Sequence, residues 1–222
     1  YIARGNVCDW GDCWGNRVDR FLMGVGYFDG KKPSLLITRG YYEKSVLQAW
    51  DWRNNSLTTR WTFDTTNPSW TAYAGQGNHN LSITDVDNDG KDEVIYGSMA
   101  VDDNGTGKHN TGLGHGDAMH ASDLDPTRAG LEVISIREWN NPAHGIHMRD
   151  ASTGSILWSK PCTAPPAEEG PGRMLSLDVD PRYAGFESWC VGGGIPGVFD
   201  AKGNLVSSVT PTTNFGIQWD GD

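Results

Sequence analysis

An acidic segment that recurs along the chain constrains the fold more than any other feature. ITDVDNDGKDEVIYG at residues 83 to 97 is echoed by ASDLDPTRAGLEVISI at 121 to 136 and by SLDVDPRYAGFESWCVG at 176 to 192, with a weaker copy, GYFDGKKPSLLITRG, at 26 to 40. Each copy reads as an apolar strand, an acidic loop and a second apolar strand. Repetition of this kind indicates one supersecondary unit that is used several times.

A hairpin signal follows the copies and completes the unit. The segments VLQAWDWRNNSLTTRWTF, GIHMRDASTGSILWS and GVFDAKGNLVSSV each read as two strands around a tight turn. Four strands per unit of roughly 40 to 55 residues are typical of a propeller blade. We therefore expect an all-β fold, a β-propeller with four-stranded antiparallel blades, and no long helix. The whole chain, 1–222, is expected to form part of a single propeller domain, with blades at roughly 16–64, 78–112, 115–160 and 173–210 and the start of the next blade at 215–222.

Charge and hydropathy exclude two classes of partner. The formal net charge is -10 and the isoelectric point is about 4.9, so a nucleic acid would meet a surface of its own sign. No apolar run approaches the roughly 18 residues of a membrane helix, so no membrane partner is expected. An acidic protein can still bind a polyanion if metal ions supply positive charge.

The four cysteines allow two interpretations. None has the C-x-x-C spacing of a zinc ribbon, and an even number is compatible with disulfides. Cys8 with Cys13 would close a small loop, leaving Cys162 to pair with Cys190; the alternative is four buried free thiols. Disulfides indicate an oxidising compartment and thus a secreted, extracellular protein.

The acidic loops have the composition of calcium sites. The first loop matches D-x-D-x-D-G with an acid at the ninth position, and calcium takes six to eight oxygen ligands from carboxylates at alternate positions and a backbone carbonyl. The two later loops carry fewer carboxylates, and there the alternative is a turn in which aspartates cap backbone amides. The predicted structural calcium ligands are Asp85, Asp87, Asp89, Lys91 (through its carbonyl), Glu93, Asp123, Asp125, Glu132, Asp178, Asp180 and Glu187.

Catalytic residues are expected at the blade entrances. The innermost strands of a propeller line one channel, so residues just ahead of them face a common mouth. Imidazoles and carboxylates there could bind a divalent ion, and nitrogen ligands would also allow zinc or manganese. The predicted ligands of this cleft ion are His79, His115, Asp117 and Glu138. Asn16, Arg17 and Asn78 at the entrances, and the loop residue Trp139, are candidates for binding substrate, and Arg173 is a candidate catalytic residue.

Several long motifs resemble those of the polysaccharide lyase family 11 rhamnogalacturonan lyases. The likeness runs over nearly the whole chain and is carried above all by GQGNHN and HGDAMHASDLDP, with support from GNRVDRFL, PSLLITRGYY, GLEVISIRE and WDGD. The resemblance implies an eight-bladed propeller that binds several Ca²⁺ ions, of which this chain would supply about half, with the remaining blades of the same protein as its partners. It also implies cleavage of the rhamnogalacturonan I backbone of pectin by β-elimination, with the cleft ion on the four ligands named above. Arg173 matches a basic position of the family's cleft, as base or as charge stabiliser; the alternative is a surface salt bridge.

Two other classes of function compete with a pectin lyase. A non-catalytic calcium-loop propeller that binds carbohydrate or protein explains the aspartate loops but gives no role to the histidines. A quinone-dependent dehydrogenase is suggested by the D-x-x-T-G-x-x-x-W turn at 150 to 158, which occurs in one blade only.

Overall fold

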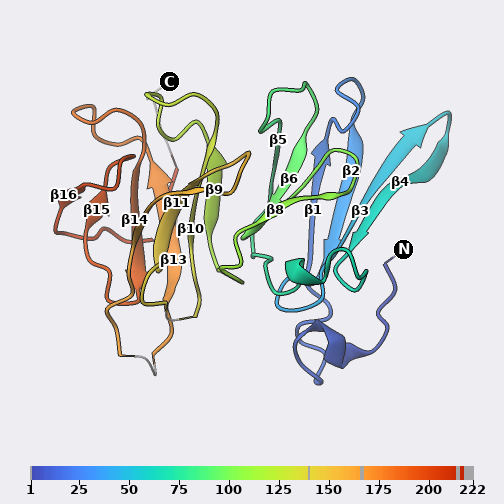
Figure 1. Cartoon of the computed structure of the whole chain (residues 1–222), viewed down its shortest axis with the longest axis horizontal. Helices are drawn as coiled ribbons and strands as arrows, with labels where there is room; N and C mark the ends of the chain where they lie inside the picture. The colour runs from blue at the N-terminus through green and yellow to red at the C-terminus, as the bar shows by residue number, and fades with distance from the viewer. Residues whose placement is uncertain (1, 140, 166–167, 214–215, 218–222) are drawn as a thin grey trace. The chain divides into compact units, whose positions relative to one another are not determined.

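Four separate four-stranded antiparallel sheets make up the part of the chain that the structure describes. The computed structural model describes residues 2–139, 141–165, 168–213 and 216–217. Within these ranges the helices are two short 3₁₀ turns, η1 (Val7–Trp10) and η2 (Thr71–Tyr73), and neither is long or apolar enough to cross a membrane. The all-β prediction and the four-stranded antiparallel sheets are confirmed. By its internal contacts the chain divides into two compact units, Tyr1–His115 and Gly116–Asp222, each with two sheets (Figure 1).

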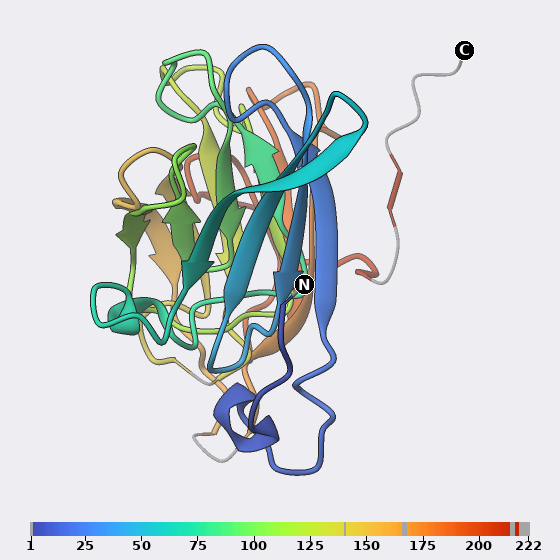
Figure 2. The same cartoon turned by 90° about the vertical axis from the view of Figure 1, so that its right-hand side faces the viewer.

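The first unit holds the sheets β1–β4 and β5–β8, each with its strands paired in chain order. In Figure 2 the β1–β4 sheet faces the viewer, with its β3–β4 hairpin reaching beyond the other strands. That hairpin turns at Asn54 and Asn55, whose φ values of 51° and 59° are those of a two-residue type I′ turn. The strands are β1 (Phe21–Gly26), β2 (Ser34–Arg39), β3 (Val46–Arg53), β4 (Ser56–Asp64), β5 (Ser82–Thr84), β6 (Glu93–Tyr96), β7 (Met99–Val101) and β8 (Gly107–Asn110).

The core of this unit lies where the two sheets pack together. Leu36, Leu47 and Phe63 of the first sheet join Val94 and Tyr96 of the second in one buried cluster. The period of two along each strand explains this, since alternate residues share a face. The same alternation leaves the other face of β1–β4 apolar and open, with Phe21, Met23 and Val25 at 49%, 71% and 60% exposure.

The second unit repeats the arrangement with sheets β9–β12 and β13–β16. Its core gathers Ile134, Ile136, Met148 and Met174 with other apolar side chains. The turn between β11 and β12 is closed by Asp150, whose carboxylate accepts hydrogen bonds from the amide and hydroxyl of Thr153. The strands are β9 (Met119–Ser122), β10 (Glu132–Ile136), β11 (Ile146–Asp150), β12 (Ile156–Lys160), β13 (Pro171–Leu177), β14 (Glu187–Gly192), β15 (Val198–Phe199) and β16 (Leu205–Ser207).

The cysteine predictions divide. Cys8 and Cys13 form a disulfide, as expected. The second expected disulfide is wrong, because Cys162 and Cys190 are free and buried. Both thiols pack as small apolar groups in the core of the second unit, where burial raises the pKa of Cys190 to about 12. Most of the expected next blade, 215–222, lies outside the described residues.

Candidate metal centres and catalytic residues

The first acidic loop is folded around the carboxylate of Asp85. Its oxygens accept hydrogen bonds from the backbone amides of Asn88, Asp89 and Gly90. Asn88 and Gly90 have positive φ values of 63° and 85°, a conformation that glycine and asparagine tolerate best. The order D-x-D-N-D-G therefore fixes a tight loop in which the remaining carboxylates converge.

Two groups of carboxylates meet at Glu93. Oxygens of Asp85, Asp87 and Glu93, and likewise of Asp89, Glu93 and Asp103, lie within 4.8 Å of one another. Glu93 is fully buried; its Oε2 accepts from the Val86 amide, and its Oε1 has no hydrogen-bond partner in the part of the chain that the structure describes. Burial raises the pKa of Glu93 to about 7 despite the Val86 bond, and the charge of Asp87 adds to the rise.

Two lysines neutralise only part of this charge. The Lys108 ammonium lies 2.6 Å from Asp87 and 3.1 Å from Asp102, and Lys91 bridges Asp89 and Asp103. Asp102 and Asp103 come from the β7–β8 turn and were not among the predicted ligands, although the run DDNG after an apolar strand is a visible signal. Closely spaced carboxylate oxygens that exceed the positive charge, around one buried glutamate, fit a bound divalent cation. These acidic groups could hold a metal ion.

The second loop carries its own positive charge. Glu132 is fully buried, and its Oε2 accepts from the amides of Leu124 and Asp125. Arg128 donates to the other oxygen, Oε1, and pairs with Asp150 at 2.7 Å. The calcium ion predicted at Asp123, Asp125 and Glu132 thus competes with an internal guanidinium.

The third loop lacks this internal cation. Glu187 is held like Glu132, with Oε2 accepting from the amides of Val179 and Asp180. Its Oε1 is buried without a hydrogen-bond partner among the described residues, and burial raises the pKa of Glu187. Arg182 is 76% exposed and pairs with Asp180. The position of Arg128 in the second loop is occupied by Tyr183 in the third loop. Its predicted calcium ligands, Asp178, Asp180 and Glu187, stay a prediction.

Replacing Arg128 with alanine is expected to lower the free energy of unfolding by about 3 to 5 kcal/mol, because it leaves the buried Glu132 carboxylate without its counterion. Calcium should restore part of the loss, since the vacated position then resembles the first loop. Urea unfolding with and without calcium measures both effects. Arg182→Ala is the matched control and should change stability by less than about 0.5 kcal/mol, because that side chain is exposed. An equal loss in both variants would contradict the assignment.

Two histidines and two tyrosines form a ring cluster in the first unit. The His79 and His115 ring centroids are 5.1 Å apart, and Tyr41 stacks on His115 at 5.4 Å. The Tyr42 hydroxyl lies 3.1 Å from Nε2 of His79. His115 Nδ1 lies 2.8 Å from the Gly77 carbonyl, a contact that requires a proton on Nδ1 and leaves Nε2 as the nitrogen suited to a cation.

Asp117, Glu138 and Arg173 lie in the second unit. Asp117 follows His115 by two residues in the chain, and its Oδ2 lies 3.4 Å from Nη1 of Arg173. Arg173 is 63% exposed. Glu138 comes two residues after β10, and its backbone carbonyl accepts a hydrogen bond from the Gly170 amide.

The four predicted substrate residues differ in exposure. Asn16 is exposed and Trp139 is 55% exposed. Arg17 is partly exposed and lies over the Tyr42 ring, whereas Asn78 is fully buried and accepts from the Asn80 amide. The binding roles of these four residues stay predictions. Tyr41 and Tyr42 were missed, although the run RGYY directly after an apolar strand places polar rings at a strand end.

The chain is an all-β protein built from repeated acidic hairpins. Its four-stranded sheets carry acidic hairpin loops, and a histidine pair lies just ahead of two strands. The whole chain, residues 1–222, matches the family model described as rhamnogalacturonan lyase family 11, C-terminal domain, and it belongs to this family. The predicted resemblance is confirmed.

Two curated relatives from Bacillus subtilis (strain 168) are similar to the chain. It is 54% identical over 221 residues to the rhamnogalacturonan endolyase YesW, a match that covers 99% of this chain and 34% of the relative. It is 51% identical over 225 residues to the rhamnogalacturonan exolyase YesX, covering 99% and 36%. The crystal structure of YesW superposes with a TM-score of 0.90, covering 99% of this chain and 36% of that one. The chain thus spans about a third of the length of these relatives.

Proposed function

We propose that this chain is part of the catalytic domain of a rhamnogalacturonan lyase that cleaves the rhamnogalacturonan I backbone of pectin by β-elimination. The observation that carries the proposal is the His79 and His115 pair in the first unit, with the His115 tautomer fixed by the Gly77 carbonyl. The alternative of a non-catalytic binding module assigns no role to this pair. Identity above 50% to relatives named as lyases supports the same conclusion.

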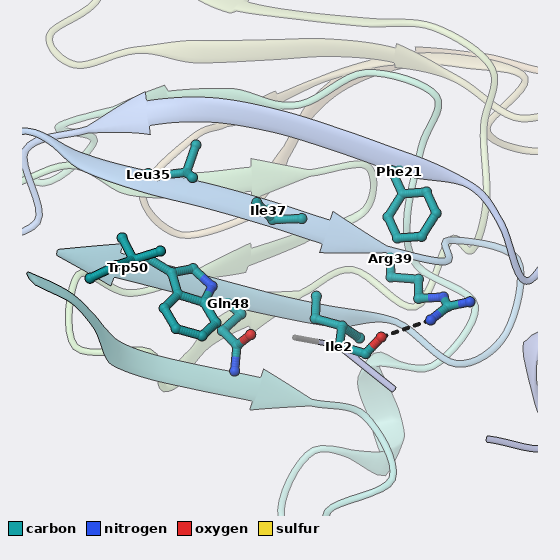
Figure 3. A pocket seen from close by; sticks show the side chains of 8 residues that line it. Ile2, Phe21, Leu35, Ile37, Arg39, Gln48 and Trp50 are labelled. Atoms are coloured by element: carbon teal, nitrogen blue, oxygen red, sulfur yellow. Dashed lines mark hydrogen bonds between the residues drawn. The ribbon is translucent and has the colours of Figure 1, made fainter. Parts of the chain in front are cut away.

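The four sheets are proposed to be blades of a β-propeller whose other blades belong to the same protein. Support comes from the open apolar face of β1–β4. Figure 3 shows Phe21, Leu35, Ile37 and Trp50 over this face, where the Arg39 guanidinium donates to the Ile2 carbonyl. Exposed apolar patches of this kind mark surfaces that pack against another element. Relatives about three times as long as the chain have the residues to supply one.

We propose that structural Ca²⁺ ions bind the acidic loops. The first loop has the strongest case, because the buried Glu93 Oε1 and its neighbouring carboxylates exceed the charge of Lys91 and Lys108. The third loop has the next strongest case through Glu187. The second has its guanidinium instead.

The catalytic cation is proposed to be a further Ca²⁺ ion held by His79, His115, Asp117 and Glu138. When bound, such an ion withdraws charge from the uronate carboxylate and so acidifies the C5 proton that β-elimination removes. The Gly77 carbonyl accepts from Nδ1 of His115 and so fixes the orientation of this ring. Tyr42 lies against both histidine rings and limits how far either can rotate.

Arg173 is proposed to stabilise negative charge on the reacting uronate. Its side chain is largely exposed, and its contact with Asp117 at 3.4 Å is long for an ion pair, so the guanidinium has donors to spare for a substrate carboxylate. A role as the base would require a neutral guanidinium, which proteins do not ordinarily provide. Secretion is proposed from the Cys8–Cys13 disulfide, since such bonds persist outside the reducing cytosol.

Incubating the full-length protein with rhamnogalacturonan I tests the activity. Ultraviolet absorbance from the unsaturated sugar should rise in calcium buffer and stop rising after chelation. Polygalacturonate serves as the control polymer and should give no product. Absence of any rise in calcium, from a protein shown to be folded, would remove the lyase proposal.

A further inference from the structure

A loop of the first unit, residues 8–17, is closed and immobilised by several independent contacts. The disulfide joins its start to Cys13. Asp12 accepts hydrogen bonds from three backbone amides, those of Trp14, Gly15 and Arg17. Trp10 is 1% exposed and donates to the Arg4 carbonyl. This loop, here called the stapled loop, therefore holds its side chains in one arrangement.

The stapled loop presents an arginine whose charge no carboxylate balances within the described part of the chain. The Arg17 guanidinium lies 4.0 Å from the centroid of the Tyr42 ring and donates one hydrogen bond to the Gly11 carbonyl. The two carboxylates nearest to it in sequence are already engaged, Asp12 by the amides and Asp19 by Arg4 and Arg39. In a protein of net charge -10, an unneutralised guanidinium with spare donors is suited to bind an anion from outside.

The surroundings of Arg17 suit a sugar. Trp14 is 88% exposed, and it lines a surface hollow together with Gly11, Asp12, Cys13, Asn16 and Arg17. An indole ring offers a flat apolar face, while the neighbouring polar groups can hydrogen-bond hydroxyls. The hollow thus combines the apolar face of the Trp14 indole with the Arg17 guanidinium, which can bind a carboxylate.

Tyr42 connects this hollow to the proposed catalytic histidines. Its ring contacts the Arg17 guanidinium, its hydroxyl lies 3.1 Å from His79, and its centroid is 4.3 Å from that of His115. Arg17 and the two histidines therefore contact the same phenol ring.

We propose that the stapled loop is a substrate subsite in which Arg17 binds the carboxylate of a galacturonate next along the polymer from the cleaved bond, while Trp14 packs against a sugar ring. This inference rests on the proposed function. In this proposal Arg17 binds a sugar that does not itself react, and it does so in the ground state. Asp12 and the disulfide hold the Arg17 side chain in position.

Arg17→Gln and Arg17→Lys variants of the full-length enzyme test the subsite. A lost hydrogen-bonded charge pair weakens binding by about 10- to 100-fold, so KM for rhamnogalacturonan I should rise by that factor in the Gln variant while kcat changes less than about threefold. The Lys variant keeps a cation over Tyr42 but cannot form two parallel hydrogen bonds to a carboxylate. Its KM should therefore lie between the KM of the wild type and that of the Gln variant. Arg4→Gln, which removes the same charge from an exposed neighbour, should leave KM unchanged.

Binding in chelator separates this proposal from the catalytic one. Calorimetric titration with a saturated rhamnogalacturonan oligosaccharide, without turnover, should show 10- to 100-fold weaker binding to Arg17→Gln than to the wild type. If the wild type binds the oligosaccharide but never forms unsaturated product, the lyase function fails while the subsite stands. Unchanged binding in both Arg17 variants, or a fall in kcat without a rise in KM, overturns the subsite. Melting curves of both variants exclude unfolding as the cause.

Discussion

The full-length protein is expected to lose activity by about 10² to 10³-fold in kcat when either His79 or His115 is replaced by glutamine, the range typical for removing one stabilising group from a charged transition state. Glutamine retains much of the side-chain volume, so the stack on Tyr41 keeps a packing partner. Metal analysis should show one calcium ion fewer per chain. The double variant should be little worse than either single one, because ligands of one ion act as a unit.

His109→Gln provides the control for this experiment. His109 is a half-buried residue of β8 in the same unit and has no place in the proposed centre, so activity and bound calcium should stay at wild-type values. Full activity in His79→Gln and His115→Gln would exclude the proposed catalytic ion. Lost activity with an unchanged calcium count would instead give the histidines a role other than metal binding.

Local patterns predicted the strands and turns because their causes are local. The alternation in β1–β4 and the Asn54–Asn55 turn follow from backbone preferences that the sequence displays. Whether Cys162 and Cys190 form a disulfide could not be predicted from local patterns. Cysteine spacing does not report whether two thiols end in one apolar core without meeting, and here that core keeps both free.

The candidate site was only partly predictable for a similar reason. His79 and His115 were identified from repeat position, and the structure brings their rings to 5.1 Å. Asp102, Asp103 and Arg128 were not identified, because their roles depend on the direction in which side chains leave a turn. Arg128 and Arg182 illustrate this: both are arginines in matching loops, yet one pairs with a buried glutamate and the other stays exposed.

Glu93→Gln is expected to change the stability of the protein in opposite directions with and without calcium. A cation present at 100 to 1,000 times its Kd stabilises the folded state by about 3 to 4 kcal/mol. In calcium, the Glu93→Gln variant should lose most of this stabilisation. In chelator near pH 8 the variant should instead equal or exceed the wild type. Its neutral amide has no buried charge to desolvate, and its carbonyl oxygen can still accept from Val86.

The effect of Glu93→Gln on stability should also depend on pH. Because burial raises the pKa of Glu93 from 4.5 to about 7, the folded state binds this proton more tightly than the unfolded state. In chelator, the Glu93 contribution to stability is therefore present below about pH 4.5 and is lost as the pH rises through 7. The difference between wild type and Glu93→Gln isolates it from other titrating groups. Urea unfolding at pH 5 and pH 8, with exposed Glu43→Gln as the charge-matched control, measures the difference.

Calcium should remove this pH dependence above pH 5, because a divalent cation beside Glu93 favours the charged carboxylate and so lowers its pKa. A difference that is the same at both pH values in chelator would show that Glu93 is not a desolvated, unneutralised acid. A pH-dependent difference that calcium leaves untouched would place the cation elsewhere. Only a centre that uses the buried Glu93 carboxylate as a ligand reverses the sign of the substitution when calcium is added.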